Sequence, residues 1–336
     1  MFLSQTVSLS DASSTAEARR AGARMASLLG LNEKKSGETA IVITEAARNA
    51  VVYGGGGQLL LSGIKSKNAT RIDVVALDRG PGIADLSQAL QDGYSTGGTP
   101  GTGLGAIKRM AEVFDVFSNN KGTAIFARIE QPENGAHQRK SSVELAGLVS
   151  PIAGEIASGD NLAWEINGDR CMILAVDGLG HGMQAAEAAE EAVRVFRAHS
   201  SESPASLITR LHDALKKTRG AAAAIAEVRT LAGTLVYAGV GNISGSIISH
   251  TLGRSLVSHN GTLGHVMSRV QEFKVEWPKD GVLVMHSDGL QSRWDLSRYS
   301  GLLNRQPALI GGVLLRDFRR ERDDASVLVL KGAAAI

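Results

Sequence analysis

Two polar residues four positions apart, Glu45 and Asn49, lie in a segment that the sequence predicts to be helical. A spacing of four places both side chains on one face of a helix. A carboxylate and an amide on one helical turn can hold a water molecule or a magnesium ion against a polyphosphate. Taken alone, such a pair is more often two solvated polar positions, so the residues that follow decide between the two interpretations.

A second set of candidate residues, Asp78, Gly80 and Gly82, follows directly after the apolar stretch IDVVAL. An aspartate at a strand end can accept a hydrogen bond from an exocyclic amine, and glycines let a ligand approach the backbone closely. On its own, this pattern is equally well explained as an ordinary β-turn.

A glycine-rich stretch then runs from Gly97 into a predicted helix. Its last three glycines, Gly101, Gly103 and Gly105, can expose backbone N–H groups at the helix N-terminus, where the helix dipole favours a phosphate. The spacing differs from that of the P-loop and from that of the Rossmann fingerprint. Each of these three sets is weak alone, but their occurrence in this order predicts a nucleotide site.

The C-terminal half carries acidic residues beside apolar stretches. Asp177 and Asp288 each follow such a stretch, the pair Asp323-Asp324 precedes another, and Asp160 follows Ser-Gly. Carboxylates at strand ends that point into one cleft supply the oxygen ligands that hard cations prefer. Two such cations would bridge a water molecule and lower its pKa, which makes it a nucleophile for a phosphate. Any single Asp-Gly is better explained as a hairpin turn.

The elements that must position these residues differ between the two halves. In the first half, helices are predicted over residues 14–29 (with Ser13 or Ser14 as N-cap and Gly30 as the stop), 38–53 and 104–114, with a short amphipathic piece at 83–91. Strands are predicted over 58–62, 71–77, 115–118 and 123–129. This mixture indicates an α/β sandwich.

The composition changes after this unit. Residues 131–142 contain a single apolar residue, which is typical of a solvated linker. We therefore expect domains at 1–130 and 145–336, joined by a linker at 131–144. The second domain is predicted to be α+β, with strands at 161–166, 171–176, 222–228, 233–239, 243–248, 282–287 and 325–330. Its helices are expected at 184–199 and 204–217, the second beginning at a Ser203-Pro204 cap.

Composition excludes several classes of function. The 336 residues are 43% hydrophobic with a net charge of +2, which indicates a globular protein without an electrostatic reason to bind nucleic acid or an anionic membrane. No apolar run approaches the roughly 20 residues that span a bilayer, and the first residues lack the pattern of a signal peptide. The single cysteine, Cys171, cannot form an internal disulfide, which fits a reducing compartment. We expect a cytoplasmic protein.

The motifs E-x-x-x-N, D-x-G-x-G and GTGLG, in this order, resemble those of the GHKL (Bergerat-fold) ATPases. More narrowly, EAARNAVVYGGGG and LQDGYSTGGTPGTGLGAIKRM are similar to the small RsbT-type serine kinases, and the resemblance covers roughly residues 10–130. It implies a Bergerat α/β sandwich that binds ATP with Mg²⁺. Under this resemblance Glu45 polarises the attacking hydroxyl, Asn49 ligates magnesium and Asp78 reads the adenine amine.

The same resemblance assigns the remaining residues of the nucleotide site. Gly80 and Gly82 would shape the adenine pocket, and Thr123 would lie beneath the adenine. Residues 95–105, which include Gly101, Gly103 and Gly105, would form the lid and the phosphate cradle.

The segments GDN, VDGLGHG, HSDGL and DDASVLVL resemble the PPM-type metal-dependent serine/threonine phosphatases, nearest to the SpoIIE/RsbX branch, over about residues 145–331. The resemblance implies an α-β-β-α sandwich with two Mn²⁺ or Mg²⁺ ions. Asp160, Asp177 and Asp288 would bind these ions together with the Gly178 carbonyl, with Asp177 and Asp288 at the catalytic centre.

Two positions in this second motif set need separate mention. Of the closing pair, the family pattern favours Asp323 as the ligand and puts Asp324 at the asparagine position. His181 could act as an acid near the leaving group or hydrogen-bond its own loop, and both interpretations stay open. The first motif reads SGD, where many relatives have GGD.

Together the two resemblances imply a bacterial signalling enzyme. It would bind ATP and remove phosphate from phosphoserine or phosphothreonine on a STAS-domain partner of the anti-sigma antagonist type, in a stress-response partner-switching circuit. The ATP-binding half would be a candidate serine kinase, and stressosome-like components or a second copy of the chain are further candidate partners. The alternative is an ATP-responsive binding module whose phosphatase half is regulatory or inactive.

Overall fold

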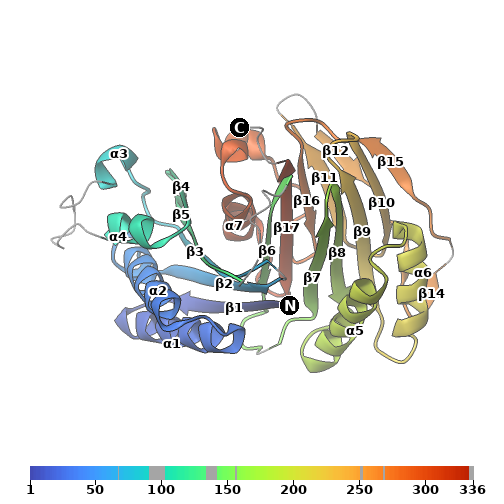
Figure 1. The fold of residues 1–336 in the computed structure, drawn as a ribbon, viewed down its shortest axis with the longest axis horizontal. Coiled ribbons are helices and arrows are strands. Elements are labelled where there is room, and N and C mark those ends of the chain that lie inside the picture. The colour runs from blue at the N-terminus through green and yellow to red at the C-terminus, as the bar shows by residue number, and fades with distance from the viewer. Residues whose placement is uncertain are drawn as a thin grey trace. The chain divides into compact units, whose positions relative to one another are not determined.

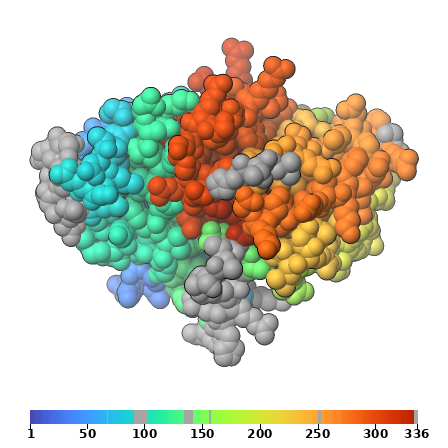
Figure 2. Space-filling model, turned by 90° about the horizontal axis from the view of Figure 1, so that it is seen from above, coloured from blue at the N-terminus to red at the C-terminus, as the bar shows by residue number. Residues whose placement is uncertain are grey.

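The protein is represented by a computed structural model that describes residues 1–66, 68–90, 103–133, 142–155, 157–249, 253–267 and 269–332, which are coloured in Figures 1 and 2. The chain divides into two compact units. Unit 1 contains Met1–Arg139 and Tyr299–Arg316, and unit 2 contains Lys140–Arg298 and Asp317–Ile336. Within the described part of the chain, no helix combines the length and the apolar character that a bilayer crossing requires.

Unit 1 is built on a five-stranded antiparallel sheet with the order β1-β2-β3-β5-β4. Its strands are β1 (Phe2–Leu9), β2 (Gly57–Lys65), β3 (Ala69–Asp78), β4 (Val113–Asn119) and β5 (Gly122–Pro132). Helices α1 (Ala12–Leu29) and α2 (Glu33–Gly54) cover one face of this sheet (Figure 1). The shorter helices are α3 (Leu86–Ala89) and α4 (Gly103–Met110), and α4 contacts α2.

The core of unit 1 lies between α1, α2 and the sheet. Val42 and Ile43 of α2 belong to one buried cluster with Ile72, Val74 and Ala76 of β3. Every second residue of β3 therefore points toward the helices, as the pleat of a strand requires. This arrangement confirms the expected α/β sandwich.

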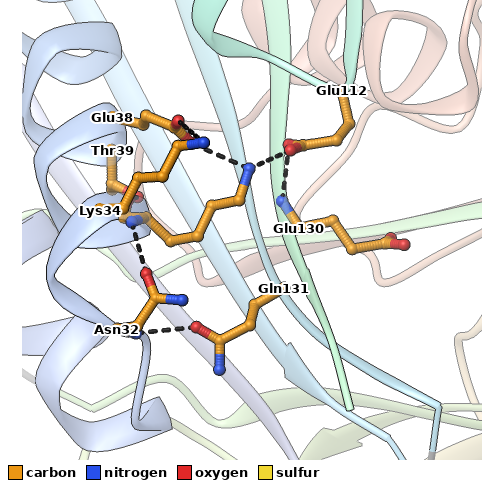
Figure 3. Close-up of polar contacts among 8 residues, drawn as sticks. Asn32, Lys34, Glu38, Thr39, Glu112, Glu130 and Gln131 are labelled. Atoms are coloured by element: carbon orange, nitrogen blue, oxygen red, sulfur yellow. Dashed lines mark hydrogen bonds and ion pairs between the residues drawn. The ribbon is translucent and has the colours of Figure 1, made fainter. Parts of the chain in front are cut away.

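The start of α2 is fixed to the sheet by a set of polar contacts (Figure 3). The Asn32 side-chain oxygen caps the helix by accepting from the Lys35 backbone amide at 2.9 Å. The Asn32 backbone amide donates to the Gln131 side-chain oxygen at 2.8 Å. The Lys35 ammonium group bonds Glu112, whose other carboxylate oxygen accepts from the Glu130 amide at 2.8 Å. These contacts join α2 to β5 and thereby fix the direction of the helix that carries Glu45 and Asn49.

The opposite face of the same sheet, which we call the outer face, is also buried. Val75, Leu77 and Phe126 lie on it and are each no more than 2% exposed. Helix α7 (Pro307–Phe318) lies against it (Figure 1), since a Cβ on Gly312 would be 3.0 Å from Leu77 Cδ2 and 3.1 Å from Val75 Cγ1. Unit 1 therefore has helices on both faces of its sheet.

Unit 2 contains two five-stranded sheets. The first has the order β15-β10-β9-β8-β7, with β7 (Asp160–Asn167), β8 (Arg170–Gly178), β9 (Ala221–Arg229), β10 (Thr234–Val240) and β15 (Phe273–Glu276). The second has the order β12-β11-β16-β17-β6, with β6 (Val143–Ser150), β11 (Ser244–Ile248), β12 (Gly253–Leu256), β16 (Val282–His286) and β17 (Ala325–Gly332). A separate hairpin pairs β13 (Gly261–Thr262) with β14 (Val266–Met267).

The two sheets of unit 2 are stacked. A Cβ on Gly147 of β6 would lie 3.0 Å from Leu162 of β7, and one on Gly245 of β11 would lie 3.0 Å from Tyr237 of β10. Helices α5 (Met183–His199) and α6 (Pro204–Leu215) pack on the other face of the first sheet and share its buried cluster, which includes Phe196. Small glycines at the facing positions permit this close stacking of sheets.

Several element boundaries differ from the expectations. Helix α1 begins at Ala12, two residues earlier than expected, because its N-cap is Asp11 rather than Ser13 or Ser14, and Ser14 is the partner in a capping box. Helix α2 begins at Glu33 rather than at residue 38. Strands β1 and β6 and helix α7 were not expected from the sequence.

Candidate nucleotide and metal sites

Asp78 lies at the end of β3, at the centre of the first candidate site. It is buried, and its Oδ1 atom accepts from the Gly80 amide at 2.9 Å and from the Thr123 amide at 3.0 Å. Among the residues that the structure describes, no hydrogen bond engages Oδ2, so this oxygen can accept from a ligand. Burial raises the pKa of the carboxyl, against the two backbone hydrogen bonds and the Arg316 charge, which lower it.

The backbone packs closely around Asp78 because three neighbouring positions are glycine. A Cβ on Gly54 would lie 2.3 Å from the Asp78 Cβ, and one on Gly80 would lie 2.8 Å from the Gly54 Cα. Gly82 has a φ of 80°, and a Cβ there would meet the Asn119 carbonyl oxygen at 2.1 Å. No side chain fits at these positions, so the glycines of the D-x-G-x-G motif are needed for the shape of this site.

Glu45 and Asn49 come together with Gly103 at the start of α4. Both side chains are half-buried on α2, and a Cβ on Gly103 would lie 3.0 Å from Glu45 Oε2 and 3.3 Å from Asn49 Oδ1. A carboxylate, an amide and a helix N-terminus thus share one location, which suits a cation held against a polyphosphate. Gly105 is buried in α4, whereas Gly101 and the rest of the expected lid, residues 95–102, lie outside the described residues.

The second candidate site begins with a direct strand pair. Asp160 of β7 lies opposite Asp177 of β8 in the register of the two strands. Asp160 is buried and accepts from the Ser287 hydroxyl at 2.5 Å. Burial raises the pKa of Asp160 well above its ordinary value, and the Asp177 charge raises it further.

Asp177 stands among several other carboxylates. Its pKa is raised to about 7, first by burial and then by the charges of Asp288 and Asp323. Asn242, which follows β10, donates its side-chain amide to Asp288 Oδ2 at 2.7 Å and to Asp177 Oδ2 at 3.4 Å. One carboxamide therefore spans two of the expected ligands.

The structure distinguishes the two members of the closing acidic pair. Asp324 is buried and uses both carboxylate oxygens on backbone amides, those of Ile152 and Gly159, each at 2.7 Å. Asp323 is only partly buried, and the Asp288 charge contributes to raising its pKa after burial. Asp324 therefore holds loops together, and Asp323 is the member suited to bind a cation.

The donor set of this site fits a hard divalent cation, because it consists of carboxylate oxygens whose charges repel one another when no cation is bound. In the described ranges, no group of three or more His, Cys, Asp or Glu side chains is already positioned to hold a metal ion.

Gly178 and His181 continue the chain beyond Asp177. The Gly178 amide donates to the Gly159 carbonyl at 2.9 Å. A Cβ on Gly178 would lie 2.1 Å from the Ala185 carbonyl oxygen, so only glycine lets the first turn of α5 pack this closely. The His181 ring is exposed, and its Nδ1 lies 3.0 Å from Glu155 Oε1. This contact joins His181 to a second loop rather than to its own.

Sequence reasoning missed three residues of this site. Asn242 had a recognisable signal, since it lies just past the end of an apolar strand, as Asp177 and Asp288 do. Ser287 and Glu155 had none, because their partners, Asp160 and His181, are brought to them only by the fold.

Comparison with protein families gives two matches in separate parts of the chain. Residues 9–129 match the histidine kinase-like ATPase domain, and residues 167–332 match the stage II sporulation protein E (SpoIIE) family. The first match contains Glu45, Asn49 and Asp78, and the second contains Asp177 and Asp288.

Two curated proteins of Bacillus subtilis (strain 168) are similar to this chain. The serine/threonine-protein kinase RsbT is 34% identical over 111 residues, which are 33% of this chain and 84% of RsbT. The phosphoserine phosphatase RsbX is 26% identical over 140 residues, which are 41% of this chain and 69% of RsbX.

Solved structures are similar to more than half of the chain. One of these structures comes from work on the bacterial stressosome, described as a modular system that has been adapted to control secondary messenger signalling. It has a TM-score of 0.52 and 27% identity, and the match covers 56% of this chain and 99% of that one. RsbX in complex with magnesium has a TM-score of 0.50 and 21% identity, covering 59% of this chain and 98% of that one, and shows a shared fold.

Proposed function

Because the chain belongs to the RsbT-like histidine kinase-like ATPases over residues 9–129 and to the SpoIIE-type phosphatases over residues 167–332, we propose that it is a cytoplasmic signalling enzyme that combines an ATP site with a phosphoserine/phosphothreonine phosphatase site. The observation that carries the proposal is the gathering of Asp160, Asp177 and Asp288 at neighbouring strand ends of unit 2. Oxygen ligands in such a group bind divalent cations that act on phosphate esters.

In the phosphatase site, some residues of this chain would bind the metal ions, and others keep those ligands in position. Asp160, Asp177, Asp288 and Asp323 would hold two Mn²⁺ or Mg²⁺ ions together with the Gly178 carbonyl. When bound, these ions supply a water of lowered pKa and neutralise the phosphate charge. Asn242 keeps the Asp288 and Asp177 carboxylates in position by donating to both. Ser287 does the same for Asp160.

In the nucleotide site we assign separate roles to three groups. The Asp78 carboxylate would accept from the adenine amine through Oδ2, inside the pocket shaped by Gly80, Gly82 and Thr123. Asn49 would hold Mg²⁺ against the phosphates, which the N-terminus of α4 at Gly103 would also bind. Glu45 would polarise an attacking hydroxyl, so this half is a candidate serine kinase.

The substrate class follows from the relatives. RsbT is a serine/threonine-protein kinase and RsbX is a phosphoserine phosphatase, and one similar structure belongs to the stressosome. We propose that the partner is a phosphoprotein of the STAS-domain, anti-sigma antagonist type, and that both halves act on the same class of partner.

A direct test is Mn²⁺-dependent hydrolysis of a phosphoserine peptide by the full chain. The wild type should hydrolyse the peptide, and the hydrolysis rate of Asp177→Asn should be at least 100-fold lower. Asp213→Asn on α6, an exposed carboxylate outside the site, is the matched control and should keep the wild-type rate. A folded wild type without metal-dependent activity on the peptide or on STAS-domain phosphoproteins would contradict the proposal.

A second assay separates a kinase from an ATP-responsive binding module. Radiolabel from γ-labelled ATP should appear on a STAS-domain protein with the wild type and with the exposed α1 variant Glu17→Gln, but not with Glu45→Gln. Binding of ATP without any transfer of label would favour the binding module.

A further inference from the structure

Helix α7 comes from the part of the chain that matches the SpoIIE family, yet it packs within unit 1. Residues Tyr299–Arg316 group with unit 1, and the ten residues Pro307 to Arg316 are all buried. Gly312, in the middle of the helix, lies against Val75 and Leu77 on the outer face of the sheet. Leu77 is the residue before Asp78, so α7 contacts the strand that carries the proposed adenine-reading carboxylate.

The segment before α7 is anchored to the sheet edge by polar and aromatic contacts. Asp115 of β4 accepts from the Arg305 guanidinium at 3.1 Å and from the Gln306 amide at 2.9 Å. The Tyr299 hydroxyl accepts from Lys121 at 3.2 Å, and the Tyr299 ring lies 6.4 Å from the Phe117 ring. Specific polar and aromatic contacts therefore hold the segment before α7 against the β4 edge of the sheet within unit 1.

The end of α7 reaches the nucleotide site directly. The guanidinium of Arg79 donates to the carbonyl oxygen of Arg316. Arg79 lies between Asp78 and Gly80 in the D-x-G-x-G motif. The Arg316 charge lies close enough to Asp78 to favour its ionised form, although burial, the larger effect, raises the Asp78 pKa overall.

After Arg316 the chain enters unit 2 and there contacts the metal site. The Phe318 carbonyl accepts from the Gln291 amide at 2.9 Å, and the Arg320 amide donates to the Gly289 carbonyl at 2.7 Å. Gly289 follows Asp288, and Asp323 comes three residues after Arg320. One continuous segment, residues 316–323, therefore leads from the partner of Arg79 to two of the proposed metal ligands.

We infer that α7 couples the two sites, and that Arg79 is the positioning residue through which a nucleotide bound at Asp78 affects the segment that carries Asp323. This inference rests on the proposed function of both sites. Nucleotide binding orders the Asp78–Gly82 loop and hence the Arg79 contact, which steadies the end of α7 and the residues that follow it. A ligand that orders a segment shared by two sites changes the other site's affinity or rate, and the effect is reciprocal.

The first test needs no variant. Hydrogen exchange of the full chain, followed by mass spectrometry at constant free Mg²⁺, should slow at least threefold in peptides covering 305–324 when ATP is saturating. Peptides from α5 and α6 should not change and serve as the internal control. The phosphatase rate on a phosphoserine peptide should change at least threefold under the same conditions.

The second test removes the contact. Arg79→Met should bind ATP but lose most of the ATP effect on the phosphatase rate, and Arg79→Lys should recover part of it. Arg24→Met on α1, an exposed arginine away from the sheet, is the matched control and should respond as the wild type does. Asp115→Asn, which weakens the other end of the same interface, should also reduce the response.

The outcomes separate the inference from the proposal beneath it. A wild type that binds ATP and hydrolyses the peptide, but shows no ATP effect on exchange or rate, overturns the coupling and leaves both site assignments standing. A normal response in Arg79→Met and in Asp115→Asn overturns the route through α7. A wild type that does not bind ATP contradicts the proposed nucleotide site, and the proposed coupling, which depends on that site, is then overturned as well.

Discussion

Asn242 donates its side-chain amide to Asp288 at 2.7 Å and lies 3.4 Å from the Asp177 carboxylate, so a neutral residue bridges two groups that repel each other. Residues that hydrogen-bond metal ligands fix the ligands' orientation, and their loss commonly costs 10- to 100-fold in metal affinity or activity. The bridge therefore makes Asn242 a supporting residue of the proposed metal site.

Asn242→Ala should raise the Mn²⁺ concentration needed for half-maximal phosphatase rate by about 10- to 100-fold. Asn167→Ala, at the opposite end of the β7–β8 pair, is the control and should leave the Mn²⁺ titration unchanged. If both variants titrate like the wild type, Asn242 does not support the ligands.

The metal-free protein should lose stability as the pH rises from about 4 to about 7. Asp177 has a pKa raised from 3.8 to about 7 in the folded protein, so the folded state binds more protons than the unfolded chain across this window. Stability falls with pH where the folded state binds more protons, here by an amount on the order of 3 kcal/mol. Chemical unfolding in EDTA at pH 5 and pH 8 measures the difference.

The Asp177→Asn variant provides the comparison for that pH effect. Its unfolding free energy in EDTA should vary less with pH than that of the wild type, and Mn²⁺ should stabilise the wild type much more than the variant at pH 8. An identical pH dependence in both proteins would show that Asp177 is not the titrating group.

Asp78→Asn should weaken ATP binding at least tenfold with little effect on folding. An asparagine keeps the Oδ1 acceptor that the Gly80 and Thr123 amides use, but it replaces Oδ2 with an amide donor that opposes the adenine amine. Calorimetric titration with ATP gives the affinity and thermal unfolding gives the stability. Unchanged ATP affinity would place the adenine elsewhere.

Asp73 on the outer face should be important for the stability of unit 1. It is buried and bonds the Arg128 guanidinium through both carboxylate oxygens, at 2.6 and 2.8 Å. Removing one partner of a buried ion pair leaves the other charge unpaired, so Asp73→Ala should cost about 3–5 kcal/mol of unfolding free energy. The double variant Asp73→Leu with Arg128→Met should recover part of this loss, and urea unfolding measures both.

The same pair predicts a sensitivity to acid. Burial alone would raise the Asp73 pKa, but the Arg128 and Arg71 charges and the Arg128 hydrogen bond lower it below its ordinary value of 3.8. The pair's contribution is therefore fully present above about pH 4 and is lost as the pH falls through the lowered pKa of the folded protein. The Asp73→Leu, Arg128→Met double variant should lose less stability than the wild type between pH 5 and pH 3.

Much of the fold could be predicted because local signals coincide with the structure. Gly30 ends α1 in the left-handed conformation, as expected, and Ser203 with Pro204 begins α6. The two family resemblances seen in the sequence are confirmed by the matches at 9–129 and 167–332. Helix α2 begins before the expected residue 38 because its cap, Asn32, is supported by Gln131 and other partners remote in sequence.

The unpredicted parts depend on contacts that sequence patterns do not carry. Helix α7 lacks a polar face because it is buried all around, and Gly311 and Gly312 lower its helical propensity. Asp177, Asp288 and the Asp323-Asp324 pair stood out because each borders an apolar strand. Arg79 did not, because its role depends on Arg316, which is far away in the chain.

The discontinuity of unit 1 has a consequence for the order in which the protein is made. The outer face of its sheet, with Val75, Leu77 and Phe126, can be covered by α7 only after the ribosome has synthesised the chain as far as Arg316. During translation the apolar sheet face of the first 139 residues therefore stays uncovered while nearly all of unit 2 is synthesised. A nascent chain stalled before residue 299 is accordingly the form of this protein most in need of a chaperone.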